Sequence, residues 1–293
     1  MMFIIKYRNI FFIISAITIA ISVFVMVTKG FTTGIDFKGG SIIEVAYDKL
    51  PDSEVLKSAL DSAGFPDARI QVAGERDVII KTKALSEPEH QTLVSTLSLN
   101  GGFQVEEKRF NSIGPTIGKE LRSKALISII LVIFGIVLFI AYAFRRVSEP
   151  VSSWKYGMVT TLTLLHDIIV PAGVFVWLGK EVDTLFVVAL LSIMGISVHD
   201  TIVVFDRIRE NLKNKLSSDF ATTVGKSLEQ TFSRSINTSV TVMFVLATLF
   251  FFGPTSTKDF SLVLWIGIFI GTYSSVFIAS PLLVVWEKFQ RRG

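Results

Sequence analysis

The chain has 293 residues, of which 50% are hydrophobic and 18% are charged, with 25 Phe and no Cys. A composition this apolar excludes a single water-soluble core, because a soluble domain of this length keeps a large polar surface. The lack of Cys excludes disulfides, Fe–S clusters and thiolate zinc sites. The formal net charge of +4 is less informative about function than the positions of the charged residues along the chain. We therefore expect several helices in lipid plus one ordinary folded insert.

A helix that crosses a membrane needs about 20 predominantly apolar residues. Six segments meet this requirement: 10–27, 125–144, 157–178, 184–205, 236–252 and 260–286. The first follows Lys6 and Arg8, as the apolar part of a signal peptide would. Its apolar stretch is too long for that role, however, and residues 27–30 do not form a small-x-small cleavage site. We interpret it as an uncleaved membrane helix.

Residues 29–124 are the one long stretch with the composition of a soluble domain. Strand signals predict four strands, over 41–47, 68–73, 76–82 and 102–110. Helix start and stop signals predict two helices, over 51–64 and 86–97, the second opened by a capping box from Ser86 to Glu89. The order β-α-β-β-α-β is that of a ferredoxin-like fold. We therefore predict a membrane α-helical bundle with an exported α+β domain.

The orientation follows from Lys and Arg in the short loops. With the N-terminus inside, the basic residues of the loops and the tail gather in the cytoplasm: Arg145, Arg146, Lys155, Arg207, Arg209, Lys213, Lys215, Lys226, Arg234, Lys288, Arg291 and Arg292. The two short outside loops carry only Lys180 and Lys258. We therefore predict both termini in the cytoplasm. The predicted organisation is a first membrane helix over 1–28, an extracytoplasmic domain over 29–124, and five further helices over 125–293.

Asp200 is an ionisable residue inside the fourth span, where a charge costs roughly 2.5–3.5 kcal/mol and marks function by default. At about 1.5 Å per residue it lies roughly 9 Å inside the boundary that Asp206 marks. Burial disfavours the charged form of a carboxyl, which suits a group that binds and releases protons. The alternative is a carboxylate that only pins helix packing. Arg234, before the fifth span, enters at similar depth; it is either the counter-charge of Asp200 or a snorkelling interfacial Arg.

His166 and Asp167 lie near the middle of the third span. Neighbouring side chains on a helix project about 100° apart, so these two need not interact. His166 also fits a hydrogen-bonded core histidine, whereas Asp167 at the bilayer centre has fewer structural explanations. His199, beside Asp200, either tunes the local field or packs. No two His residues have metal-ligand spacing on one helix face, so we predict no metal site.

The glycine-rich run Gly34-Ile35-Asp36-Phe37-Lys38-Gly39-Gly40 follows the first span on the outside. It lacks the Gly-Lys-Ser/Thr order of a P-loop and lies on the wrong side of the membrane for nucleotide. We interpret Gly34, Asp36, Gly39 and Gly40 as a hinge or tight connection between the first helix and the exported domain.

This run, residues 195–211, His166-Asp167 and residues 234–239 together resemble the smaller, SecF-type members of the SecD/SecF family of the bacterial Sec export pathway. The resemblance covers nearly the whole chain. It implies a six-helix half of an RND-type core whose other half SecD supplies. It further implies that the ion gradient is used to draw polypeptide out of the SecYEG channel, with the positions matching Asp200 and Arg234 tied to proton passage.

The partners that the resemblance implies are SecD, SecYEG, YajC, YidC, an unfolded translocating polypeptide and the lipid of the bacterial inner membrane. It implies no cofactor and no nucleic acid. Two positions depart from the family motif: Ile196 stands where Tyr is common, and His199 where Asn is usual. A His titrates near neutrality and an Asn does not, so either His199 adds a titrating group or the ion pathway differs in detail. The residues serve protons or sodium equally well.

Two other function classes fit the sequence less well. A self-sufficient ion-coupled transporter of small molecules is disfavoured because one chain holds only half of an RND-type bundle and its outer domain is small. A membrane-anchored enzyme is disfavoured because the exported domain has no nucleophile–base pair or metal cluster. A pure scaffold would remain if Asp200 were inert. We predict a non-enzymatic, energy-coupling subunit with Asp200 as its protonatable carboxylate.

Overall fold

The computed structural model describes residues 1–99, 101–144 and 151–292, apart from the side chains of Ser153 and of residues 290–292. Arg145, Arg146 and the side chains of Arg291 and Arg292, which contribute to the predicted orientation, lie outside this description. The chain divides into two compact units. The first comprises Met1–Thr32, Ile127–Glu181 and Leu185–Gly293, and the second comprises Thr33–Leu126 and Val182–Thr184.

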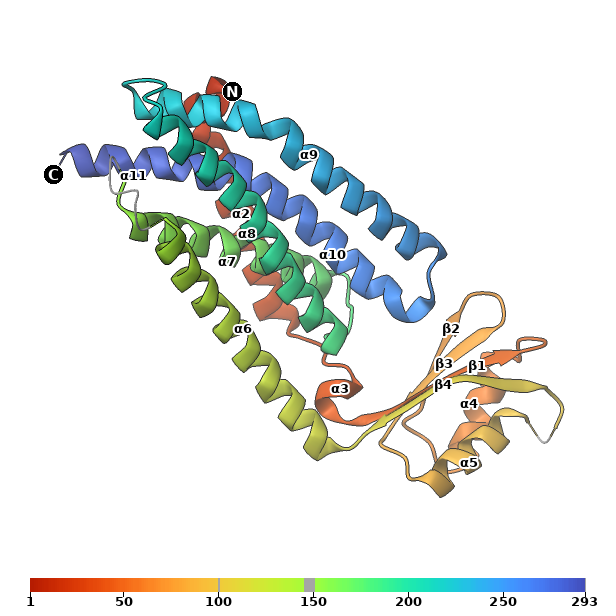
Figure 1. Ribbon diagram of the computed structural model, residues 1–293. Coiled ribbons are helices and arrows are strands. Elements are labelled where there is room, and N and C mark those ends of the chain that lie inside the picture. Colours follow the sequence, from red (N-terminus) through yellow and green to blue (C-terminus); the bar gives the residue numbers. More distant parts are fainter. Residues whose placement is uncertain (100, 145–150, 293) are drawn as a thin grey trace. The chain divides into compact units, whose positions relative to one another are not determined.

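The first unit is helical (Figure 1). It contains α1 (Met2–Lys6), α2 (Arg8–Lys29), α7 (Ser153–Trp177), α9 (Phe220–Phe252), α10 (Thr255–Ser274), a π-helical segment η1 (Ser275–Ala279) and α11 (Ser280–Arg292). It also contains α6 (Pro115–Ala143) from Ile127 onward and α8 (Thr184–Lys213) from Leu185 onward. Among the described residues, six helices are long and apolar enough to cross a membrane, with α10, η1 and α11 together forming the last. The predicted multi-pass membrane protein with six spans is confirmed.

Three helices extend well beyond the predicted spans at one end. The helix α6 begins at Pro115 rather than 125, α8 continues to Lys213 rather than 205, and α9 begins at Phe220 rather than 236. The early start of α9 has a local cause, because the Asp219 side chain accepts a hydrogen bond from the backbone N–H of Thr222 at 2.8 Å and caps the helix. Apolar length predicts the spans, whereas caps and polar ends decide where the helices stop.

Burial within the helical unit is uneven. In the most apolar window of α7, 67% of the residues are buried, against 11% in α2, 6% in α6 and 17% in α9. The helix α7 is therefore central, and its Tyr156 stacks on Phe144 with ring centroids 5.2 Å apart. The outer faces of α2, α6 and α9 are apolar and unburied, as surfaces that meet lipid or another chain would be.

The second unit contains a four-stranded antiparallel sheet in the order β2-β3-β1-β4. Its elements are α3 (Ile35–Lys38), β1 (Gly40–Tyr47), α4 (Ser53–Ser62), β2 (Arg69–Ala73), β3 (Asp77–Thr82), α5 (Glu87–Leu97) and β4 (Val105–Ile113). This strand order and the order of elements confirm the ferredoxin-like fold. The short helix α3 lies inside the glycine-rich run, where the sequence predicts only a connection.

The core of this unit lies between the sheet and the helices α4 and α5, which cover the same face (Figure 1). Alternate residues of β1, namely Ile43, Val45 and Tyr47, are buried there against Leu60 and Leu93. The capping box predicted at Ser86 is present, with Glu89 bonded back to the Ser86 backbone. Period-two burial on the strands and a capped amphipathic helix explain why this stretch folds as a domain.

Candidate functional site

Asp200 lies on α8 and is 5% exposed. Its one hydrogen bond to a described residue is long: the Ser239 hydroxyl on α9 donates to Oδ2 at 3.5 Å. Ser239 in turn accepts a hydrogen bond from the Thr272 hydroxyl of α10 at 2.6 Å. No Lys or Arg among the described residues forms an ion pair with Asp200. The carboxyl group is therefore buried where α8, α9 and α10 meet, with few partners.

The two residues predicted to act with Asp200 lie on exposed faces. The side chain of His199 is 63% exposed, and its Nδ1 is 3.8 Å from Asp200 Oδ1, beyond hydrogen-bond distance. Arg234 is exposed on α9, and among the described residues no ion pair joins it to Asp200. The structure thus places the three residues in one region, but it does not bring Arg234 and Asp200 into contact.

Asp167, on α7, is fully buried and has three hydrogen-bond partners. Its Oδ2 accepts from the hydroxyls of Ser197 on α8 at 2.5 Å and Ser274 on α10 at 2.7 Å. Its Oδ1 is 2.8 Å from Nδ1 of His166. The expectation that His166 and Asp167 need not interact is corrected, because Nδ1 of the buried imidazole lies within hydrogen-bond distance of the carboxyl group. Asp167 joins three helices.

A set of hydroxyl groups along α10 connects the surroundings of the two carboxyls. Thr272 reaches Ser239, Ser274 reaches Asp167, and Ser275 is 2.9 Å from Thr201. These residues stand at the start of η1, and π-helical segments are frequent at functional sites. Sequence reasoning missed these hydroxyls, although Ser and Thr at one-turn spacing in apolar helices are a signal that could have found them.

Close packing of α8 on α10 depends on the glycines of the GxxxG pattern in α10. A Cβ atom on Gly267 would lie 2.1 Å from the Ile193 side chain, and one on Gly271 would lie 3.1 Å from Ser197 Cβ. Small residues allow helices to approach closely in this way. The approach is what lets Ser197 and Ser274 share one carboxylate oxygen.

The glycine-rich run packs against backbone within the second unit. Gly39 has φ +83°, and a Cβ atom there would lie 2.8 Å from Pro115 Cα at the start of α6. Asp36 Oδ2 accepts a hydrogen bond from the backbone N–H of Thr184, the first residue of α8, at 2.8 Å. A carboxylate is favoured at a helix N-terminus. Gly34 N–H donates to Val182 O at 2.8 Å. The run therefore joins the starts of α6 and α8.

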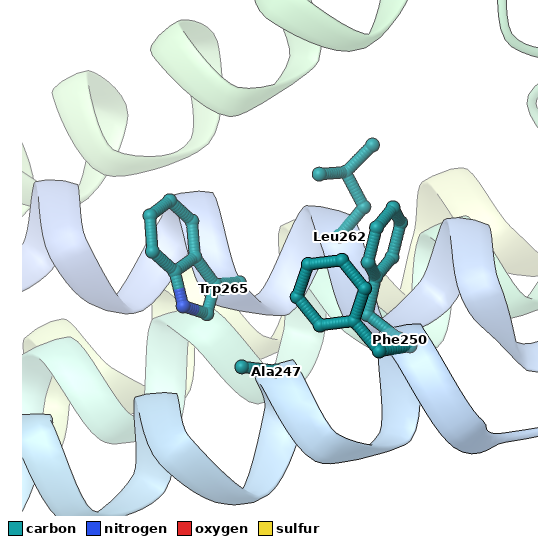
Figure 2. Close-up of a pocket in the computed structure, with 5 residues that line it drawn as sticks. Ala247, Phe250, Leu262 and Trp265 are labelled. Carbon is teal, nitrogen blue, oxygen red and sulfur yellow. The ribbon is translucent and has the colours of Figure 1, made fainter.

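One groove lies apart from these residues, between α9 and α10. It has a volume of about 210 Å³ and an apolar lining of Ala247, Phe250, Phe251, Leu262 and Trp265 (Figure 2). These lining residues offer no carboxylate or hydroxyl to an ion. Within the described ranges, no group of three or more His, Asp or Glu residues could hold a metal ion.

Two family models match the chain. The C-terminal model of the protein export membrane proteins SecD/SecF matches residues 94–289, and the SecD/SecF GG motif matches residues 24–49. The protein translocase subunit SecF of Thermobaculum terrenum is 42% identical over 97% of this chain and 94% of its own length. The subunit of the same name from Anaerolinea thermophila is 35% identical, over 98% and 94%.

Solved structures show the same fold. The crystal structure of SecDF, a translocon-associated membrane protein from Thermus thermophilus, has a TM-score of 0.84 and 31% identity over 97% of this chain. This chain spans 38% of the length of that protein. SecDF in its super-membrane-facing form has a TM-score of 0.68. Because the two family models together span the glycine-rich run and both buried carboxyls, the chain belongs to the SecD/SecF family of protein export membrane proteins.

Proposed function

We propose that this protein is a non-enzymatic accessory subunit of the Sec export machinery, which works with SecD to couple an ion gradient to late translocation through SecYEG. The relatives that match over nearly the whole chain are named protein translocase subunit SecF, which supports this role over a self-sufficient transporter. The similar SecDF chain is much longer. The exposed apolar faces of α2, α6 and α9 offer a SecD half surface on which to pack.

The surroundings of Asp200 carry the ion-coupling part of the proposal. A carboxylate that only pins helices needs a full set of donors, as Asp167 has. Asp200 is nearly as buried, but its one interhelical hydrogen bond is 3.5 Å long. A buried polar group left with poor partners costs free energy, and such a cost persists at sites where it serves function. Asp200 therefore fits the ion carrier and Asp167 fits the structural pin better.

In this proposal, the helix α8 transmits the change of charge at Asp200 to the exported domain. The helix α8 carries Asp200, and its first residue, Thr184, is held by Asp36 of the glycine-rich run. Movement of α8 when Asp200 changes charge would act on the base of the domain through this bond. Arg234 serves as the counter-charge after its side chain turns from the exposed face of α9.

The proposed location is the bacterial inner membrane, with cytoplasmic termini and the ferredoxin-like domain outside. This orientation rests on the basic residues of the loops, such as Arg207 and Lys226, and on the two cations of the outside loops. The coupling ion is a proton or sodium, since a carboxyl with hydroxyl neighbours accommodates either.

The test is export of a reporter precursor by proteoliposomes that contain SecYEG, SecA, ATP, SecD and this subunit. Wild type is compared with Asp200→Asn at equal protein level, and with Asp206→Asn as a control, because Asp206 is an exposed carboxylate on the same helix. Each run is repeated with the proton gradient and then the sodium gradient collapsed. We expect the gradient-dependent gain in late translocation to disappear in Asp200→Asn alone while SecD binding persists. Equal gains in Asp200→Asn and wild type would refute ion coupling through Asp200.

A further inference from the structure

A second cavity, with a volume of about 270 Å³, lies where α2 begins and α11 approaches its end. Arg8 and Asn9 of α2 line one side, and Val285, Lys288 and Phe289 of α11 line the other. Two of these residues are cations, one is an amide and two are apolar, and none of them is acidic. The cavity thus combines positive charge with an apolar wall, and it lies apart from Asp200 and Asp167.

Arg8 is held in place with unused hydrogen-bonding capacity. Its Nη1 donates to the backbone oxygen of Ile5 at 2.9 Å, which fixes the guanidinium at the turn between α1 and α2. Its Nε is buried and has no hydrogen-bond partner among the described residues. Within the same part of the chain, neither Arg8 nor Lys288 forms an ion pair. Nε itself is covered, so a ligand in the cavity would meet the Nη groups of this partly exposed side chain.

The neighbouring residues place the cavity at the level of lipid headgroups. Tyr7 and Trp154 are exposed, and Trp154 packs edge-on against Trp286, the residue two before Lys288, with ring centroids 6.0 Å apart. Tyr and Trp gather where a membrane meets water. Phe289 is 71% exposed beside the cations. A basic pocket between membrane helices at this level is a typical site for an anionic lipid headgroup.

We propose that this cavity binds the phosphodiester headgroup of an anionic membrane phospholipid. Arg8 and Lys288 contact the phosphate, since a guanidinium with free N–H groups matches phosphate geometry. Asn9 bonds the remainder of the headgroup, while Val285 and Phe289 pack on the upper acyl chain. The lipid would tie the start of α2 to the end of α11. Free phosphate shares the anionic chemistry, but it would make no use of the apolar wall. This inference does not depend on ion coupling at Asp200.

The test is native mass spectrometry of the purified full chain, titrated with phosphatidylglycerol, cardiolipin or phosphatidylcholine in detergent. The variant is Arg8→Gln with Lys288→Gln. The control is Lys213→Gln with Lys226→Gln, which removes two exposed cations outside the cavity. We expect the wild type and the control to bind both anionic lipids at least tenfold more tightly than phosphatidylcholine, and the variant to lose that preference.

If the double substitution disturbs folding, a second variant and competition with inorganic phosphate still test the proposal. Val285→Trp fills the cavity and leaves both cations, and we expect it to weaken phosphatidylglycerol binding at least tenfold. Anionic-lipid binding within twofold of wild type in both variants would overturn the proposal. So would displacement of the lipid by millimolar inorganic phosphate, which would identify a soluble ion as the ligand. A loss of SecD binding with lipid binding unchanged would instead assign the cavity to a partner protein and also overturn it.

Discussion

Gly39 offers a sharp test of how the glycine-rich run is built. It has φ +83° and ψ 155°, a backbone region that is essentially restricted to glycine. Its missing Cβ would lie 2.8 Å from Pro115 Cα and 2.9 Å from Pro115 N, which are backbone atoms that cannot turn aside. The joint between this run and the start of α6 is therefore closely packed. Any side chain at this position must strain the backbone and also push the two segments apart.

The two costs of Gly39→Ala are separable. Backbone strain contributes about 1–3 kcal/mol, and overpacking contributes about 1–3 kcal/mol more. Gly30 is the matched control, because its φ of +68° and ψ of 172° impose the same kind of strain while no atom lies within 4 Å of its missing Cβ. Gly34→Ala should cost least, since the φ of Gly34 is −69° and its nearest neighbour would be 3.3 Å away.

Hydrogen exchange of the full chain in nanodiscs measures this difference, because it reports local opening free energies. The amides to follow are those of β1 and β4, whose ladder begins with Gly40 opposite Ile113. A loss of about 2 kcal/mol corresponds to roughly thirtyfold faster exchange. We expect that acceleration or more in Gly39→Ala, and unchanged β1 and β4 exchange in Gly30→Ala. If β1 and β4 exchanged in Gly39→Ala as they do in Gly30→Ala, neither the strain at Gly39 nor its close packing against Pro115 would weaken the domain.

Two further predictions concern stability. Asp167→Leu removes the shared partner of three hydrogen bonds, and each lost bond costs about 0.6 kcal/mol or more. The Asp167→Leu variant should therefore have a lower melting temperature in detergent than wild type. Asp200→Leu should have a melting temperature equal to that of wild type or higher. Equal melting would contradict their separate roles. Hydrogen bonds from Lys83, followed by those from the Ser86 backbone and hydroxyl, lower the pKa of Glu89 from 4.5 to about 2. Its stabilising effect is therefore full above pH 4.5 and is lost as the pH falls toward 2. Rate-corrected hydrogen exchange of α5 should show this acid dependence in wild type and not in Glu89→Gln; persistence in the variant would refute it.

Local patterns account for most of the fold that the sequence predicts. Runs of apolar residues indicate all six spans, because lipid forces each backbone polar group into a helix. In the ferredoxin-like domain, the capping box at Ser86 is a local signal that the structure bears out. The element order is enough to identify the ferredoxin-like topology, since few arrangements bury the apolar faces of two helices on a four-stranded sheet.

Local sequence patterns predict only part of the candidate site. Depth in an apolar span singles out Asp200 and Asp167 as costly residues, and a family motif points to Arg234. Their hydrogen bonds depend on helix rotation and close approach, which spacing along one chain does not specify. The hydroxyls of Ser274 and Ser239 could therefore not be assigned to either carboxyl from the sequence.

The sequence by itself determined the membrane class, the number of spans, the ferredoxin-like domain and the identity of the buried carboxyls, because each depends on composition or on contacts within a few residues. Only the tertiary structure decided that Asp167 is saturated with donors while Asp200 is poorly bonded, and that Asp36 holds the start of α8. It also decided that Arg8 and Lys288 share one cavity. These relations join residues far apart in the chain, and packing between elements alone sets their distances.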